Sequence, residues 1–159
     1  FTESFNAFDF SQATGLSVDF VQDNHSFSRQ WTLRGMHCQQ EHVQGKLVRV
    51  VAGVVFDAVV DIRKTSPTFG KWVGIELSAK NHRQLWVPPG LAHGFLVLSE
   101  TAEFLYKTTD YYFPEFEVSL LWNDVDLNIA WPLQLLHESP QLSKKDLAAI
   151  TWRSLSNDA

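Results

Sequence analysis

The sequence predicts an all-β fold, an antiparallel β-sandwich or barrel built as one domain. Short apolar runs of strand length recur at fairly even spacing, and turn signals rich in Pro, Gly, Asn and Ser separate them. No helical pattern lies between these runs, which excludes a Rossmann-like fold. A chain of 159 residues, 45% hydrophobic and 19% charged, is long enough to bury a core.

Helices are expected only near the two ends of the chain. Phe1, Phe5 and Phe8 share one face of a helix over residues 3–8, and a second helix is expected over residues 144–150. Ser143 and Asp146 have the S-x-x-D spacing of a helix cap, which places a carboxylate near the positive end of the second helix. Taken alone, this pattern gives Asp146 a structural role.

The predicted strands lie between the helices. Residues 33–39, LRGMHCQ, are strand-like, and over residues 46–63 apolar side chains alternate with Asp57, Asp61 and Arg63. This alternation at period two predicts a β-hairpin with one buried face. Further strands are expected over residues 72–77, 84–87, 94–98, 103–110 and 119–122.

Charge and cysteine content exclude several classes of protein. The formal net charge is −5 and no run of lysines or arginines is present, so neither a nucleic-acid surface nor a polybasic membrane anchor is expected. Cys38 is the single cysteine, which excludes a disulfide framework and favours a reducing compartment. No apolar run approaches the roughly 20 residues of a membrane span, and no signal peptide is visible. We therefore expect a cytoplasmic protein.

A cluster of cationic and titratable side chains interrupts the first predicted strand and begins the next. Strand alternation would place Arg34 and His37 on opposite faces, unless Gly35 between them bends the chain. A small domain gains nothing by burying Arg34 and Lys46 as isolated cations. The pattern therefore predicts a kink that turns Arg34 and His37 toward one cavity.

A second histidine lies in PPGLAHGF, residues 88–95. The spacing P-x-G-x-x-H resembles the second motif of the cupin superfamily, small jelly-roll barrels that often hold a metal. Two histidines, His37 and His93, are too few ligands for a typical zinc, iron or manganese site, so no metal is expected. A structural alternative is that His93 begins a strand and holds a turn. Tyr106, Tyr111 and Tyr112 precede a proline turn, where a hydroxyl can reach a ligand at a barrel mouth.

Longer segments carry a resemblance over essentially the whole chain. They are VQDNHS (21–26), LRGMHCQ (33–39), QGKLVRV (44–50), FDAVVDIRKTSPTFGKWVG (56–74), LSAKNHRQLWVPPGLAHGFLVLSE (77–100), AEFLYKTTDYY (102–112), LWND (121–124) and LSKKD (142–146). In this order they closely resemble the dTDP-4-dehydrorhamnose 3,5-epimerase family of metal-independent cupins. The resemblance implies one cupin jelly-roll domain over residues 1–159, a homodimer without cofactor, and a dTDP-linked 4-keto-6-deoxy sugar as substrate.

The resemblance also implies catalytic roles. The reaction inverts the carbons on both sides of a ketone, so a base removes a proton from one face and an acid returns one to the other. By similarity His37 is the base, Asp146 orients it, Lys46 faces the developing enolate, and Tyr112 is the acid. Tyr111 is the alternative acid.

Substrate contacts are implied for a further set of residues. Arg34 and His93 would hold the sugar or its phosphate, and Gln22 and Asn24 would line the same pocket. The nucleotide and phosphate side would include Glu117 and Lys145.

This chain departs from the family pattern at several places. Cys38 replaces an aromatic residue, and the chain lacks an early strand and a D-x-R-G segment that the family carries before Phe1. The alternatives are a single-carbon epimerase or a ketoisomerase on the same scaffold, a sugar-nucleotide binding module without catalysis, and a metal-dependent cupin.

Overall fold

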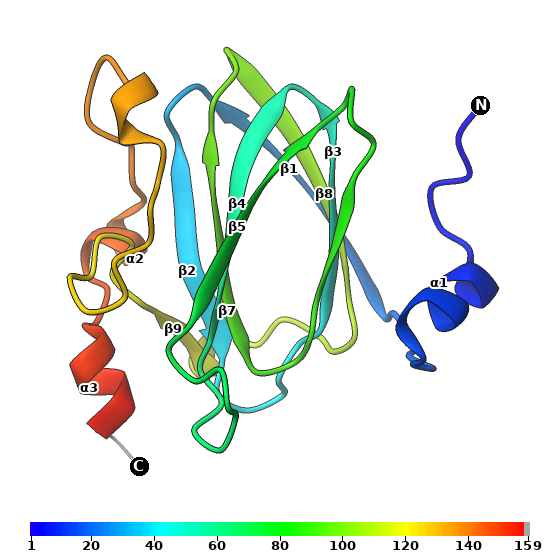
Figure 1. Ribbon diagram of the computed structural model, residues 1–159, viewed down its shortest axis with the longest axis horizontal. Coiled ribbons are helices and arrows are strands. Elements are labelled where there is room, and N and C mark those ends of the chain that lie inside the picture. The colour runs from blue at the N-terminus through cyan, green and yellow to red at the C-terminus, as the bar shows by residue number, and fades with distance from the viewer. Residues whose placement is uncertain (158–159) are drawn as a thin grey trace.

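Two antiparallel sheets face each other in a computed structural model that describes residues 1–157 (Figure 1). The 4-stranded sheet contains, in spatial order, β1 (Gln22–Arg29), β8 (Thr101–Thr108), β3 (Lys46–Ala52) and β6 (Gln84–Val87). The 5-stranded sheet contains β5 (Trp72–Ser78), β4 (Val54–Asp61), β7 (Leu91–Val97), β2 (Leu33–Gln39) and β9 (Glu117–Ser119). The predicted all-β sandwich is therefore confirmed.

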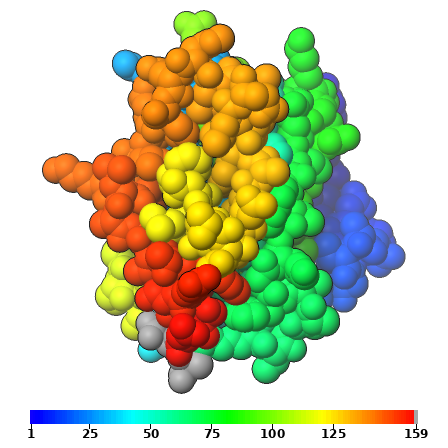
Figure 2. Space-filling view, turned by 60° about the vertical axis from the view of Figure 1, so that its left-hand side comes forward, coloured from blue at the N-terminus to red at the C-terminus, as the bar shows by residue number. Residues whose placement is uncertain are grey.

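The 5-stranded sheet is buried on both faces along its central strands, whereas Val73 on the edge strand β5 is 63% exposed. Between the sheets, Val55, Phe95 and Phe104 belong to one apolar cluster. On the other face, Leu96 and Val60 pack with side chains from the C-terminal third of the chain, such as Trp131. Figure 2 shows this C-terminal third, in yellow to red, covering that side of the molecule. Strands of this sheet consequently carry few solvent-facing positions.

The predicted hairpin over residues 46–63 is wrong in its pairing. β3 and β4 follow each other at Gly53, which has φ +83°, but β3 pairs with β6 and β8 while β4 pairs with β5 and β7. The turn at Gly53 thus leads from one sheet to the other. Period-two alternation marks a strand but does not select its partner.

The remaining strand predictions are confirmed with small shifts at their ends. The predicted strands 72–77 and 84–87 correspond to β5 and β6, and 94–98 and 103–110 to β7 and β8. The prediction 119–122 is wrong in its bounds, because β9 (Glu117–Ser119) shares only Ser119 with it. β1 was not predicted from alternation. Its burial alternates between half-buried and exposed residues, without the apolar side chains that reveal a strand.

The helices differ from their predicted positions. The first, α1 (Ala7–Thr14), begins four residues later than the predicted helix over residues 3–8, because the Asn6 side chain caps it by accepting from the backbone N–H groups of Phe8 and Asp9. The second prediction, 144–150, becomes α2 (Lys144–Leu147), followed by α3 (Trp152–Asn157). α2 stops early because the backbone of Ile150 pairs with Ser119 and Leu121 beside β9. Short 3-10 turns form at Pro114–Phe116 and Leu133–Leu135. Within residues 1–157, the helices are all too short or too polar to cross a membrane.

Candidate active site

A cavity of about 350 Å³ opens between the two sheets. It is lined by nine of the predicted site residues: Gln22, Asn24, Arg34, His37, Lys46, His93, Tyr112, Glu117 and Lys145. They come from both sheets, from the segment after β8 and from α2. Residues that are up to 123 positions apart in the chain therefore share one space.

The predicted kink at Gly35 is confirmed. The pairing of β2 with β7 shifts register between Arg34 and His37, and Gly35 has φ +126°. An added side chain at Gly35 would meet the backbone of Gly94 at 2.5 Å, so glycine is required where the strands approach so closely. Because of this bulge, Arg34 and His37 both line the cavity.

His37 and Asp146 form a pair at the cavity wall. His37 Nε2 lies 2.5 Å from Asp146 Oδ1, and the Asp146 side chain is 1% exposed. Burial alone would raise the pKa of Asp146, but hydrogen bonding to His37 and Ser143 and the His37 charge hold it below its usual value. Since Nε2 is bonded to Asp146, Nδ1 is the imidazole nitrogen that can act on a ligand.

Asp146 makes the contacts that both interpretations of the sequence expect. Ser143 Oγ accepts from the Asp146 backbone N–H at 3.1 Å, which is the predicted helix cap. The Ser143 hydroxyl also donates to Asp146 Oδ2 at 2.9 Å, and the Gly35 N–H lies 3.5 Å from the same oxygen. The cap therefore fixes the carboxylate that holds His37.

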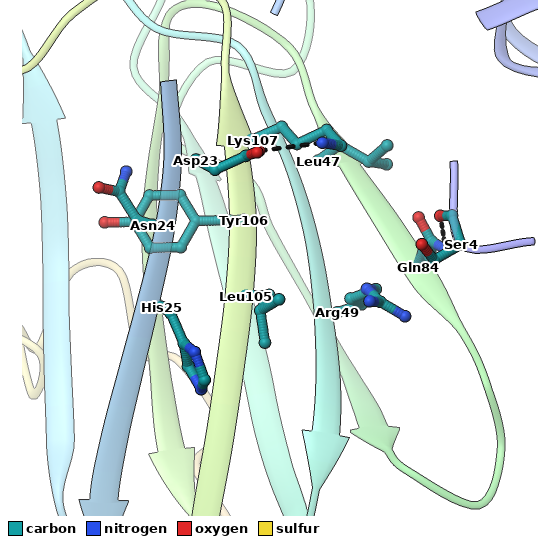
Figure 3. A pocket seen from close by; sticks show the side chains of 10 residues that line it. All are labelled: Ser4, Asp23, Asn24, His25, Leu47, Arg49, Gln84, Leu105, Tyr106 and Lys107. Atoms are coloured by element: carbon teal, nitrogen blue, oxygen red, sulfur yellow. Dashed lines mark hydrogen bonds and ion pairs between the residues drawn. The ribbon is translucent and has the colours of Figure 1, made fainter. Parts of the chain in front are cut away.

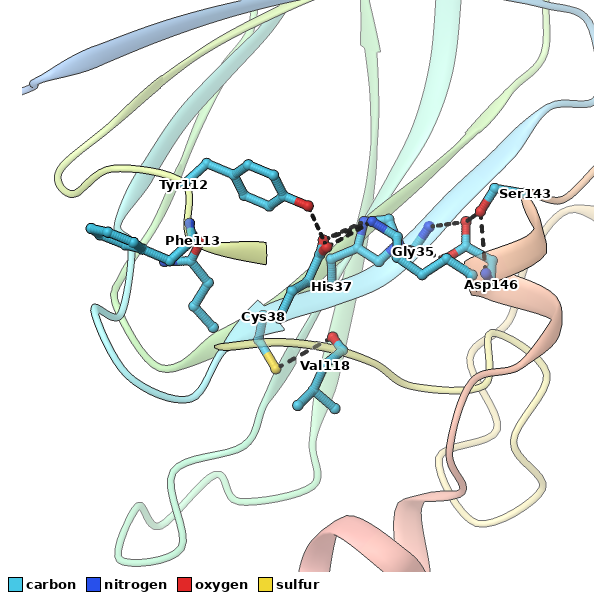
Figure 4. Close-up of polar contacts among 11 residues, drawn as sticks. Gly35, His37, Cys38, Tyr112, Phe113, Val118, Ser143 and Asp146 are labelled. Carbon is cyan, nitrogen blue, oxygen red and sulfur yellow. Dashed lines mark hydrogen bonds and ion pairs between the residues drawn. The ribbon is translucent and has the colours of Figure 1, made fainter. Parts of the chain in front are cut away.

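Tyr112 approaches His37 from the side opposite to Asp146, as Figure 4 shows. Its hydroxyl donates to Glu117 Oε2 at 2.8 Å. Burial and this hydrogen bond raise the pKa of Tyr112 to about 12. Tyr111 is more exposed and is not among the cavity-lining residues, whereas Tyr106 lines the cavity from β8. The geometry favours Tyr112 over Tyr111 as a group that can reach a ligand beside His37.

The three cationic side chains of the cavity differ in the hydrogen bonds and ion pairs that they make. Within residues 1–157, Lys46 makes no hydrogen bond or ion pair, and burial lowers its pKa. Arg34 Nε donates to Ser28 Oγ at 2.9 Å. Lys145 Nζ lies 2.9 and 2.8 Å from the two carboxylate oxygens of Glu117. Lys46 is therefore the ammonium group that remains available to an anionic oxygen in the cavity.

His93 has a partner that sequence reasoning missed. Its Nε2 lies 2.8 Å from Asp57 Oδ2, and the Asp57 side chain is fully buried. The alternation had placed Asp57 on the polar side of a hairpin; in fact that side faces the other sheet. Asp57 Oδ1 is buried and has no hydrogen-bond partner within the described chain. His93 also pairs directly with His37 across β2 and β7, so the two histidine–carboxylate pairs are neighbours.

A second hollow, of about 300 Å³, lies on the outer face of the 4-stranded sheet beside the N-terminal segment (Figure 3). There the Gln84 amide donates to the Ser4 carbonyl, and Lys107 pairs with Asp23. Of the predicted site residues, only Asn24 reaches it. The chemistry-bearing side chains are concentrated in the inner cavity.

Comparisons with known proteins agree with this fold and cavity. The family model described as dTDP-4-dehydrorhamnose 3,5-epimerase matches residues 1–154. The enzyme of that name from Salmonella typhimurium is 59% identical over 150 residues, which cover 94% of this chain and 80% of the relative.

Solved structures show the same architecture. The dTDP-6-deoxy-D-glucose-3,5-epimerase of Legionella pneumophila, in complex with dTDP-4-keto-L-rhamnose, is 55% identical with a TM-score of 0.89, covering 94% of this chain and 78% of that one. A 3'-monoepimerase from Streptomyces bikiniensis, in complex with dTDP-quinovose, is 35% identical with a TM-score of 0.85, covering 94% and 74%. The chain belongs to the dTDP-4-dehydrorhamnose 3,5-epimerase family.

Proposed function

We propose that this chain is an isomerase that converts dTDP-4-dehydro-6-deoxy-D-glucose to dTDP-4-dehydro-L-rhamnose by inverting C3 and C5. The observation that carries the proposal is the arrangement around His37. An imidazole that is hydrogen-bonded to a carboxylate faces a cavity that also contains a tyrosine hydroxyl and a half-buried ammonium group. Proton transfer next to a ketone needs these three kinds of group.

The proposed roles follow from the atoms that remain free. His37 Nδ1 removes the proton next to the carbonyl, while Asp146 fixes the ring and stabilises its protonated form. The charge of Lys46 stabilises the oxygen of the enolate that forms. Tyr112 returns a proton to the other face of the sugar. Its hydroxyl lies on the side of His37 opposite to Asp146, where the sugar would bind.

Substrate contacts are proposed for the rest of the lining. Arg34 binds the sugar or its phosphate, His93 holds the sugar, and Gln22 and Asn24 line the same pocket. The Gln22 amide donates to Asn24 Oδ1 at 3.0 Å, so these two side chains form one polar edge. Lys145 is proposed on the nucleotide and phosphate side, and Glu117 links it to Tyr112 through hydrogen bonds to both side chains.

A homodimer is also proposed. The outer face of the 4-stranded sheet leaves Phe27 and Val51 exposed at 57% and 37%, whereas the C-terminal third covers the corresponding face of the other sheet. Sedimentation equilibrium at several concentrations tests this: a mass of two chains supports it, and one chain throughout contradicts it. The cytoplasmic location stays a prediction.

Proton NMR of the substrate in deuterated buffer tests the activity. The proposed function predicts that the unmodified chain removes both the C3 and the C5 proton signals. Loss of one signal would instead identify a single-carbon epimerase, like the Streptomyces bikiniensis relative. Binding without loss of either signal would identify a non-catalytic module.

A further inference from the structure

Inverting two carbons with one base and one acid creates a proton imbalance. After the first inversion, His37 carries an extra proton and Tyr112 has lost one. The second inversion requires a neutral imidazole and a protonated tyrosine again, so a proton must pass from the base to the acid. The need for this proton transfer rests on the proposed function.

Glu117 lies between the two groups. Its Oε1 is 3.9 Å from His37 Nδ1, and its Oε2 accepts from the Tyr112 hydroxyl at 2.8 Å. The side chain is only 11% exposed, so bulk water has limited access to it. Since His37 Nε2 is bonded to Asp146, the proton gained by His37 is on Nδ1, the nitrogen that faces Glu117.

We infer that Glu117 relays the proton from His37 to Tyr112 between the two inversions. The Nδ1–H bond of the imidazolium breaks and an O–H bond forms on Glu117. The carboxyl group then turns, its O–H bond breaks, and the O–H bond of Tyr112 forms. Glu117 ends as the carboxylate it was, His37 is neutral, and no other reactant is consumed.

Electrostatic interactions favour both steps of the relay, first proton uptake by Glu117 and then proton release to Tyr112. When Tyr112 has lost its proton, two anionic oxygens lie in hydrogen-bond contact, and their repulsion favours proton uptake by Glu117. Once Tyr112 is neutral, Glu117 returns to the ionised form. Burial alone would raise its pKa, but hydrogen bonds from Lys145 and Tyr112 and the charge of His37 hold it below the usual value. Glu117 therefore passes the proton on and does not retain it.

One helix turn supports both ends of this path. Lys145 holds Glu117 through both carboxylate oxygens, and the next residue, Asp146, holds His37. Relay and base are thus positioned by neighbouring residues of α2 (Lys144–Leu147). This arrangement differs from simple substrate binding by Glu117, because its carboxylate is connected to both proton-transfer groups.

The test compares the rates of inversion at the two carbons in Glu117→Gln, followed by the NMR signals of the singly and doubly inverted sugars in ordinary water. The amide keeps the size of the side chain and can accept from Tyr112, but it cannot carry the proton. We expect inversion at the first carbon to persist, while inversion at the second falls at least tenfold relative to the first. The second-carbon rate should then rise with buffer concentration, because protons must come from solution.

Two further variants make the test specific. Glu115→Gln, an exposed position two residues earlier, should behave as the unmodified chain. Glu117→Asp keeps a carboxyl group and should recover part of the second-carbon inversion. Equal loss at both carbons in Glu117→Gln, or no loss at either, would overturn the relay and leave the proposed function standing. Absence of exchange in the unmodified chain would overturn both.

Discussion

His37 and Asp146 are joined across 109 positions of sequence by a 2.5 Å contact between Nε2 and Oδ1. His37 is on β2 in the 5-stranded sheet, and Asp146 is on α2, which packs beside β2. The Asp146 side chain is only 1% exposed, so its carboxylate can act on a ligand only through His37. Its position is explained by orientation of the imidazole.

Asp146→Asn should lower kcat by about 10²- to 10⁴-fold, because the amide cannot stabilise the imidazolium. Nucleotide binding should change little, since Asp146 lies behind His37 and away from the cavity. Ser143→Ala is the milder comparison, because it removes one hydrogen bond to the carboxylate and the helix cap. Steady-state kinetics with isothermal titration of dTDP measures both effects. Near-normal kcat in Asp146→Asn would contradict the pairing role.

Tyr112→Phe should impair reprotonation more than proton abstraction. The variant should still exchange substrate protons with deuterated solvent, while the yield of inverted product falls at least tenfold. Tyr111→Phe provides the matched control, because its exposed ring lies outside the cavity lining. If exchange and yield fell together in Tyr112→Phe, or if Tyr111→Phe had the larger effect, Tyr112 would lose its assignment as the acid.

The Asp61 carboxylate stabilises the fold away from the His37 cavity. Its carboxylate accepts from Arg63, Ser66 and Thr68, and the Arg63 hydrogen bonds, acting against burial, hold its pKa well below the usual range. Asp61→Asn should lower the free energy of unfolding by about 2–4 kcal/mol near neutral pH, because the remaining donors lose a charged acceptor.

The pH dependence of this effect follows from the sign of the shift. A carboxylate with a lower pKa in the folded state stabilises the fold above its unfolded pKa, about 3.9, and this contribution is lost as the pH falls further. Urea unfolding from pH 7 to pH 3 should therefore show a shrinking difference between Asp61→Asn and the unmodified chain. Asp126→Asn, which removes an exposed pair with Arg153, should cost much less. A difference that grew toward low pH would contradict the assignment.

Cys38 should be chemically silent in the folded protein. Burial raises the pKa of its thiol to about 11, although the charge of Lys46 acts in the opposite direction. Very little thiolate exists at pH 8, and the residue is 5% exposed. Mass spectrometry after iodoacetamide treatment should show labelling only after unfolding. Equal labelling rates in the native and unfolded chain would show that the thiol is accessible.

The sequence predicted the sandwich because strand alternation and turn residues are local signals. It also predicted that Gly35 would turn Arg34 and His37 together, because a glycine between two such side chains marks a bend. Pairing was less predictable: β3 and β4 have the same alternation whether they form a hairpin or cross between sheets. The choice depends on partners such as β7 and β8, far along the chain.

In the site, too, contacts between distant segments were harder to predict than local features. Asp57 looked solvent-facing because apolar residues occupy the other side of β4, yet Asp57 faces the 4-stranded sheet across the sandwich, and Trp131 and its neighbours cover the opposite, apolar side. No local signal reveals that cover. The pairing of Asp146 with His37 was likewise available only from the family resemblance, since the local pattern around Ser143 indicates a helix cap.

The most direct test of the central claim is proton NMR of His37→Asn with the dTDP-linked 4-keto-6-deoxy sugar in deuterated buffer, beside the unmodified chain. If His37 is the base for both inversions, the C3 and C5 proton signals of the sugar should persist with the variant, which should still bind dTDP. Both signals should disappear with the unmodified chain. Loss of both signals at the normal rate in His37→Asn would contradict the account.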